Sequence, residues 1–108
     1  MGIEQLKELN EVSGTSFHGQ TLTATAEELI RVFGPPTIDQ NGEGDKTNLE
    51  WCMKTSDGVV FTVYDWKEYR KIALDEPIEW HIGTHERDDS NIVYNHVVRY
   101  LMDLISKY

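Results

Sequence analysis

Two alternating segments separated by a short turn constrain the fold of this chain more than any other feature. Residues 49–55 carry apolar side chains at every second position, and residues 59–66 repeat that pattern after the turn Ser56-Asp57-Gly58. Alternation with a period of two predicts strands that bury one face. A three-residue hairpin loop requires a positive φ at its last position, which Gly58 can adopt. The two segments therefore predict an antiparallel hairpin.

The length of the loop also predicts the register of the hairpin. A three-residue loop pairs Thr55 with Val59 and sets Trp51 opposite Val63. One face of the hairpin then collects the large apolar residues, namely Leu49, Trp51, Met53, Val59, Phe61 and Val63. A two-residue loop would move one strand by a residue and place Val60, Thr62 and Tyr64 against that face. We prefer the longer loop because it makes the better core.

Two helices are predicted from their start and stop signals. Thr25-Ala26-Glu27-Glu28 has the form of a capping box, while Gly34 and Pro35-Pro36 stop the segment, so residues 25–33 are predicted to be helical. Near the C-terminus, residues 91–106 place apolar side chains in one stripe at helical spacing: Val93, Val97, Tyr100, Leu101 and Leu104. We expect this second helix to pack across the sheet.

The remaining segments give weaker signals. Ile3, Leu6 and Leu9 recur every third residue and predict a short helix that ends near Ser13-Gly14. The other expected elements are a weak strand within residues 15–23, a surface loop at 37–48, a charged connector at 67–77 and a strand at 78–83. At 108 residues the chain fits a single domain. The expected fold is α+β, with an antiparallel sheet of three or four strands packed on two or three helices.

Charge and composition narrow the classes of function. Nineteen acidic residues against ten basic ones give a net charge of −9. Such a chain is repelled by nucleic acids and by anionic membranes, so direct binding to either is not expected. Mimicry of nucleic acid stays open, although acidity more often serves solubility. A single cysteine, no signal-peptide pattern and no long apolar run predict a cytoplasmic protein.

The face of the sheet opposite the predicted core contains the candidate binding residues. Alternation places Glu50, Cys52 and Thr62 on this outer face. Aromatic side chains are enriched at binding sites, and we select six residues of the outer face and the connector: Tyr64, Trp66, Lys67, His81, Lys54 and Glu79. The alternative is that residues 15–22 or the first helix cover this face as a second core layer.

The sequence offers little support for metal binding or catalysis. His81 and His85 have a spacing that binds zinc on a helix, but on a strand they lie roughly 13 Å apart. Cys52 and His81 could act as a nucleophile and base only if their strands are adjacent, and no third group orients them. We predict no metal, no cofactor and no enzymatic activity.

Residues 33–83 contain a series of short motifs: Phe33-Gly34-Pro35-Pro36-Thr37, Gly44-Asp45-Lys46, Glu50-Trp51, Asp57-Gly58, Tyr64-Asp65-Trp66-Lys67 and Glu79-Trp80-His81-Ile82-Gly83. In these motifs the chain resembles a group of small, uncharacterised tailed-phage proteins. The resemblance implies a phage or prophage origin and brings no assigned activity. In architecture, a capped helix ending in Phe-Gly-Pro before a Trp-bearing sheet is also similar to modules of β-lactamase-inhibitor and outer-membrane-lipoprotein type.

Three functions are compatible with these observations. The leading expectation, from resemblance and composition, is an accessory factor that binds and disables a protein of the host cell. The second is a protein that sequesters a nucleotide-like ligand, with the base stacked on Tyr64 or Trp66 and the phosphate met by Lys67 or His81. The third is a component of the virion or of its assembly.

Overall fold

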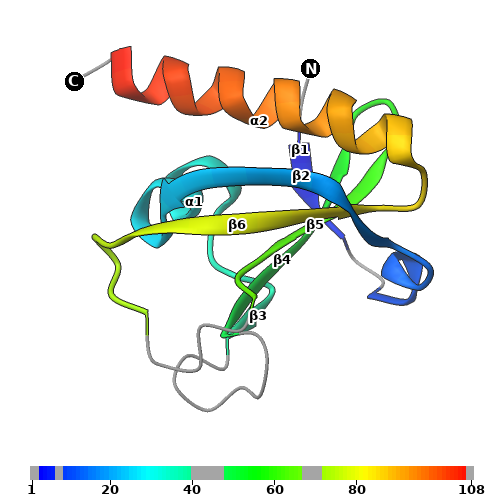
Figure 1. Ribbon diagram of the computed structural model, residues 1–108, viewed down its shortest axis with the longest axis horizontal. Coiled ribbons are helices and arrows are strands. Elements are labelled where there is room, and N and C mark those ends of the chain that lie inside the picture. The colour runs from blue at the N-terminus through cyan, green and yellow to red at the C-terminus, as the bar shows by residue number, and fades with distance from the viewer. Residues whose placement is uncertain (1–2, 7–8, 40–47, 67–71, 107–108) are drawn as a thin grey trace.

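The structure is a computed structural model that describes residues 3–6, 9–39, 48–66 and 72–106. Within these residues it contains one sheet of six strands, two α-helices and a 3-10 helix (Figure 1). The strands are β1 (Ile3–Gln5), β2 (Ser16–Thr25), β3 (Ile38–Asp39), β4 (Leu49–Thr55), β5 (Val60–Tyr64) and β6 (Pro77–Thr84). The helices are η1 (Leu9–Val12), α1 (Ala26–Phe33) and α2 (Arg87–Ser106). The α+β class is confirmed, but the sheet has more strands than the three or four predicted.

All strand pairs are antiparallel, and the sheet order is β1-β4-β5-β6-β2, with β3 paired to β4 off this path. Two short strands share the edge of β4, because β3 pairs with its first residues and β1 with its last. The gap between them is closed by local contacts. The amide of Cys52 donates to Thr37 Oγ1 at 2.9 Å, and the amide of Leu6 donates to the Cys52 carbonyl at 3.0 Å.

The hairpin of β4 and β5 has the predicted register. Trp51 pairs with Val63, and Met53 pairs with Phe61. The amide of Thr55 donates to the Val59 carbonyl at 2.9 Å, and Gly58 adopts a φ of 91°. The three-residue loop is therefore confirmed.

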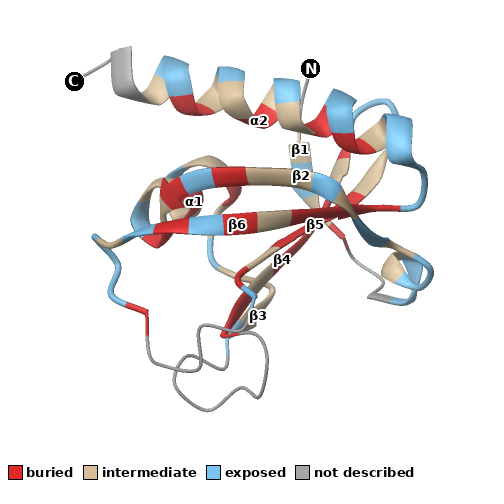
Figure 2. Ribbon diagram, in the orientation of Figure 1, coloured by how far each residue is buried: buried red, intermediate tan, exposed pale blue. Residues whose placement is uncertain are grey.

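Both α-helices lie on the face of the sheet that the large apolar side chains occupy (Figures 1 and 2). The rings of Trp51 and Trp80 meet edge to face at 5.4 Å in the centre of this core. Their indole nitrogens donate to the carbonyls of Gly34 and Ala24 at 2.9 and 2.8 Å, so no buried indole N–H is left unpaired. The buried stripe of α2 consists of Val93, Val97 and Leu101. Neither helix is long and apolar enough to cross a membrane, as far as the described residues go.

The start and stop signals at the two ends of α1 act as predicted. Thr25 Oγ1 accepts from the Glu28 amide at 3.1 Å, and the Thr25 amide donates to Glu28 Oε1 at 2.9 Å. At the other end the amide of Gly34 donates to the Ile30 carbonyl at 2.7 Å. Thr25 is the cap rather than the first helical residue. The helix α2 begins at Arg87, earlier than predicted, because its acidic first turn belongs to the helix.

The prediction for the N-terminus is wrong. Residues 3–5 form β1 rather than a helix, since Ile3 pairs with Thr55 and Gln5 with Met53. Three apolar residues that lie three positions apart are compatible with a helix, but also with a strand followed by a 3-10 turn.

The weak strand predicted within residues 15–23 is β2, which pairs along the length of β6. A bulge between Phe17 and Thr21 contains Gly19 at a φ of 98°. In the predicted loop at 37–48, Ile38 and Asp39 form β3, and residues 40–47 lie outside the described part of the chain. Residues 67–71 of the predicted connector also lie outside it.

Truncation of the two core aromatics tests this packing. Trp51→Ala and Phe61→Ala are each expected to lower the free energy of unfolding by about 3–5 kcal/mol, because both side chains are fully buried. Met102→Ala is the control, since Met102 is 64% exposed, and should change it by less than about 0.5 kcal/mol. Urea denaturation measures both values. A loss below about 1 kcal/mol for either aromatic would contradict the placement of the core.

Candidate functional site

Four rings gather on the outer face of the sheet, opposite the helices. Phe17 and His81 stack with centroids 4.1 Å apart, and Trp66 lies 6.1 Å from His81 in a nearly parallel orientation. Tyr64 meets Trp66 and His81 edge-on at 6.2 and 5.6 Å. Phe17 and Trp66 are each 41% exposed, which is high for large apolar side chains. We call these four residues the aromatic cluster.

The sheet register explains why these rings meet. Antiparallel pairing places Tyr64 of β5 directly beside His81 of β6. Phe17 of β2 pairs with Gly83, which has no side chain, so the phenyl ring can lean toward His81. Trp66 follows the end of β5. The cluster therefore combines residues from three neighbouring strands.

A buried carboxylate holds the segment that contains Trp66. Asp65 is fully buried and accepts hydrogen bonds from the amides of Asn48 and Leu49 at 2.7 and 2.9 Å. The side-chain amide of Asn48 donates to the other carboxylate oxygen of Asp65 at 2.9 Å. These bonds tie the end of β5 to the start of β4. Asp65 thus fixes the backbone between Tyr64 and Trp66 and positions both rings.

A hollow of about 240 Å³ lies beside the cluster. Its described lining comes from η1, β2 and the three central strands, and consists of Val12, Thr15, Ser16, Glu50, Thr62, Tyr64, Trp66 and Gly83. The segment around η1 covers the other part of the outer face, where Glu11 pairs with Lys54 at 3.6 Å. Of the two segments considered as a cover, η1 in the predicted first helix lies over one part of this face. Residues 16–22 instead extend the sheet as part of β2, and Phe17 and Trp66 of the cluster stay exposed.

Burial shifts the acid–base behaviour of three residues at this site. Loss of hydration has the largest effect on Glu50 and raises the pKa of its carboxyl group. A hydrogen bond from the Cys52 thiol lowers this pKa, and the charge of Asp65 raises it. Burial and the neighbouring Glu50 raise the pKa of Tyr64. Burial lowers the pKa of His81, and the charge of Glu79 opposes that shift. At neutral pH His81 is therefore mainly uncharged, and Glu50 is the acidic group of the described lining.

The structure separates the six candidate residues chosen from sequence. Tyr64, Trp66 and His81 come together in the cluster. Glu79 is exposed on β6, in the position paired with Thr23. Lys54 is engaged with Glu11 on the covered part of the face. The sixth candidate, Lys67, lies outside the described residues.

Sequence reasoning missed Phe17 and Gly83 as parts of the site, and it placed Glu50 on the outer face without assigning it a role. The signal for Phe17 was a lone large aromatic in an otherwise polar strand. Gly83 ends a well-formed alternation, and a glycine at that point of a strand often marks a close approach. Neither feature is decisive without knowledge of which strands are neighbours.

The nucleophile–base arrangement of Cys52 and His81 does not form. Cys52 pairs with Thr62 and His81 pairs with Tyr64, so β5 separates the two residues. Cys52 is also fully buried. His85 lies beyond the end of β6, where its ring nitrogen Nε2 is 3.0 Å from the Glu11 carbonyl oxygen. Over the described part of the chain, no three metal-ligating side chains come together.

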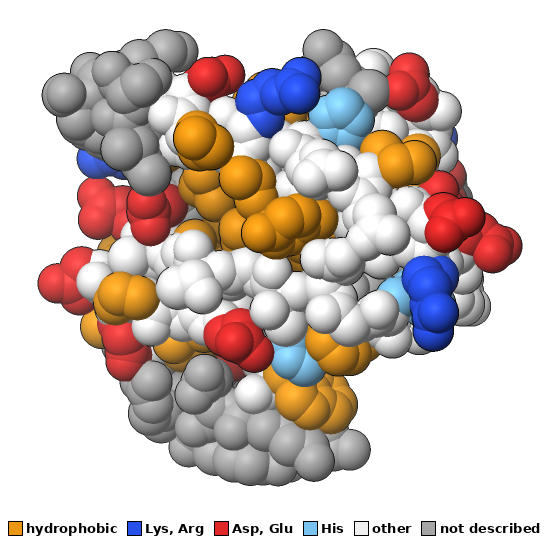
Figure 3. All heavy atoms as spheres, turned by 45° about the horizontal axis from the view of Figure 1, so that its top comes forward, with side chains coloured by type: hydrophobic (Ala, Val, Ile, Leu, Met, Phe, Trp, Pro, Cys, Tyr) orange, Lys and Arg blue, Asp and Glu red, His pale blue; other side chains and the backbone are white. Residues whose placement is uncertain are grey.

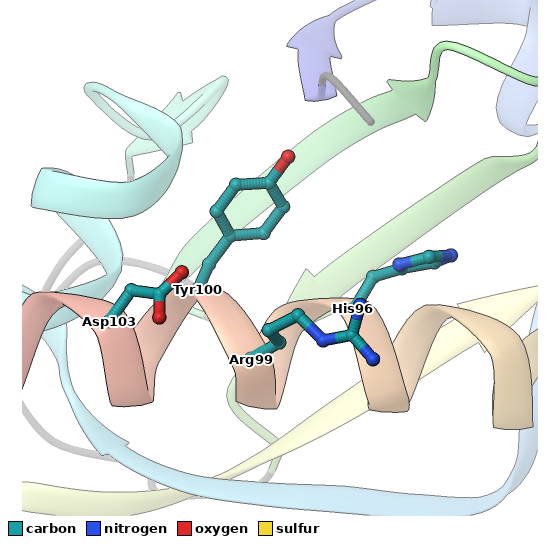
Figure 4. Close-up of a pocket in the computed structure, with 4 residues that line it drawn as sticks. All are labelled: His96, Arg99, Tyr100 and Asp103. Atoms are coloured by element: carbon teal, nitrogen blue, oxygen red, sulfur yellow. The ribbon is translucent and has the colours of Figure 1, made fainter.

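A second hollow, of about 210 Å³, lies along α2 (Figure 4). Its described lining comes from this helix alone, and comprises His96, Arg99, Tyr100 and Asp103. Hydrophobic side chains gather near the centre of the face shown in Figure 3. Met102 of α2 is one of the exposed large hydrophobic residues. The described lining of this second hollow thus offers one wall, whereas the hollow beside the aromatic cluster is lined from several strands.

Comparisons of the chain with protein-family models, curated protein sequences and solved structures find no match. The function must therefore be argued from the geometry of the site.

The floor of the hollow provides a test of this geometry. A Cβ atom on Gly83 would lie 2.6 Å from Thr62 Oγ1, and Thr62 is itself buried. Gly83→Ala is expected to lower the free energy of unfolding by about 1–3 kcal/mol through this overlap. In a double-mutant cycle Thr62→Ala should remove part of that penalty. Additive effects, measured by urea denaturation, would contradict the close approach.

Cys52 provides a second test. Burial, followed by the charge of Glu50, raises the pKa of its thiol to about 12. At pH 8 the thiol stays protonated and is shielded from solvent, so it should not react with a disulfide reagent such as Ellman's reagent in the native protein. Complete reaction is expected after denaturation in urea. Rapid stoichiometric labelling of the folded protein would show that the outer face near β4 is open.

Proposed function

We propose that this protein is a non-catalytic, phage-type accessory factor that binds and modulates a protein of the host cell through the aromatic cluster. The observation that carries the proposal is the exposure of Phe17 and Trp66 beside a hollow. A large aromatic side chain left in water forgoes the free energy of burial, and a partner surface restores it. The resemblance of residues 33–83 to small phage proteins supports the phage-type role.

Charge favours a protein over a nucleotide as the occupant. The net charge of −9 repels an anionic ligand, and the described lining of the hollow adds the carboxylate of Glu50. His81 offers little positive charge at neutral pH because burial lowers its pKa. The parallel arrangement of Trp66 and His81 is nevertheless suited to stacking on a base. Sequestration of a nucleotide-like ligand is therefore the second candidate.

Capture from host lysate followed by binding of the purified partner tests the proposal. Wild-type protein should retain one stoichiometric host protein, and Phe17→Ala and Trp66→Ala should each weaken its binding about 30-fold or more, as expected for hot-spot residues. Met102→Ala is the matched control, because it also removes an exposed apolar side chain but lies on α2. Calorimetry with the purified partner measures the dissociation constants.

The other outcomes would reject the proposal in favour of the alternatives. Release of a small molecule in native mass spectrometry, with its retention lost in Trp66→Ala and no host protein captured, would establish sequestration. Sedimentation of the protein with virions, without either binding partner, would establish a structural component.

A further inference from the structure

The hollow beside the aromatic cluster combines two kinds of wall. The aromatic residues Tyr64 and Trp66 line it, and so do three residues that carry hydroxyl groups, namely Thr15, Ser16 and Thr62. Glu50 is the charged side chain of the described lining. It pairs across the strands with Tyr64, so their Cβ atoms lie about 5 Å apart. A carboxylate and aromatic faces thus share one small space.

The carboxylate of Glu50 has a weak partner in the described structure. The Cys52 thiol contacts its Oε2 at 3.5 Å, and a thiol is a poor donor. The nearest cation along β4, Lys54, is engaged by Glu11 instead. The salt bridges of Arg31 with Glu27 and of Lys54 with Glu11 do not involve Glu50. Glu50 is therefore a partly buried acid without a described cationic partner.

We propose, on the basis of the function proposed above, that this hollow receives an arginine side chain of the protein partner. A guanidinium group is planar, stacks on aromatic faces and forms paired hydrogen bonds with a carboxylate. Tyr64 and Trp66 offer the faces, Glu50 offers the carboxylate, and the hydroxyl oxygens of Thr15 and Thr62 can accept the remaining N–H groups. The negative charge of the whole protein attracts the same group from a distance.

The acid–base behaviour of Glu50 supports this assignment. Burial raises the pKa of this carboxyl, so the folded protein alone disfavours its charged form. A guanidinium placed in the hollow would supply the missing opposite charge. An anionic group would instead add repulsion, and a neutral one would leave the charge uncompensated.

A small probe separates this inference from the proposed function. N-acetyl-arginine N-methylamide is titrated into ¹⁵N-labelled protein, and the citrulline analogue serves as a neutral control of nearly the same shape. The arginine probe should shift the indole N–H of Trp66 and the amides of Thr62 and Gly83, with a dissociation constant on the order of millimolar, as expected for one small group. The citrulline probe should leave these signals unchanged.

Two substitutions that each remove one negative charge give the matched comparison. Glu50→Gln should weaken binding of the arginine probe at least about tenfold, because the charge and the paired acceptors are lost. Asp75→Asn should not, since Asp75 is exposed in the turn before β6. Trp66→Ala is a further variant that tests the aromatic wall without removing charge. Equal affinity in Glu50→Gln and Asp75→Asn would overturn the inference.

The outcomes of the two experiments are independent. If the host protein is bound through Phe17 and Trp66 but the arginine probe causes no shift at Trp66, the inference fails and the proposed function stands. If the probe binds in a Glu50-dependent way and no host protein is captured, the arginine site stands and the proposed function fails.

Discussion

The register of β4 against β5 is the constraint on which the rest of the structure depends. The loop that ends at Gly58 pairs Thr55 with Val59. Alternation then determines which face of the sheet each remaining side chain of the two strands occupies. In this register Trp51 and Phe61 enter the core. Glu50 and Tyr64 face the other way. A slip of one residue would exchange the two sets, so the same hydrogen bonds determine both the core and the site.

The core side of the sheet depends on two kinds of hydrogen bond. Some are local in sequence, and others give a buried N–H group its acceptor. The capping box of Thr25 and Glu28 closes within one turn, and the indole N–H groups of Trp51 and Trp80 each find a carbonyl of the segments flanking α1. These contacts couple α1 to the sheet at both of its ends. Because both α-helices pack on this face, it is η1 with its flanking residues that covers part of the other face within the described chain.

This division explains how much of the structure could be predicted from sequence. The hairpin, α1 and the buried stripe of α2 were predictable, because alternation, caps and helical periodicity act over a few residues. The pairing of Ile3 with Thr55 and of Phe17 with Gly83 joins distant segments, and nothing near Ile3 or Phe17 specifies a partner. For the site, Tyr64 and His81 followed from alternation on their own strands. Their contact with Phe17 depended on the order of the strands.

Glu50 indicates that the outer face is shaped by more than folding. An acid whose pKa is higher in the folded state than in the unfolded state lowers stability as the pH rises through that interval, so ionisation of Glu50 opposes folding. A glutamine in its place would fill the same space without that cost. The rings of Phe17 and Trp66, which are each 41% exposed, contribute less to stability than fully buried rings would. An acid whose ionisation lowers stability and two incompletely buried rings therefore lie on the same face of the sheet. Local departures of this kind from the requirements of folding are expected where a surface has been selected for binding.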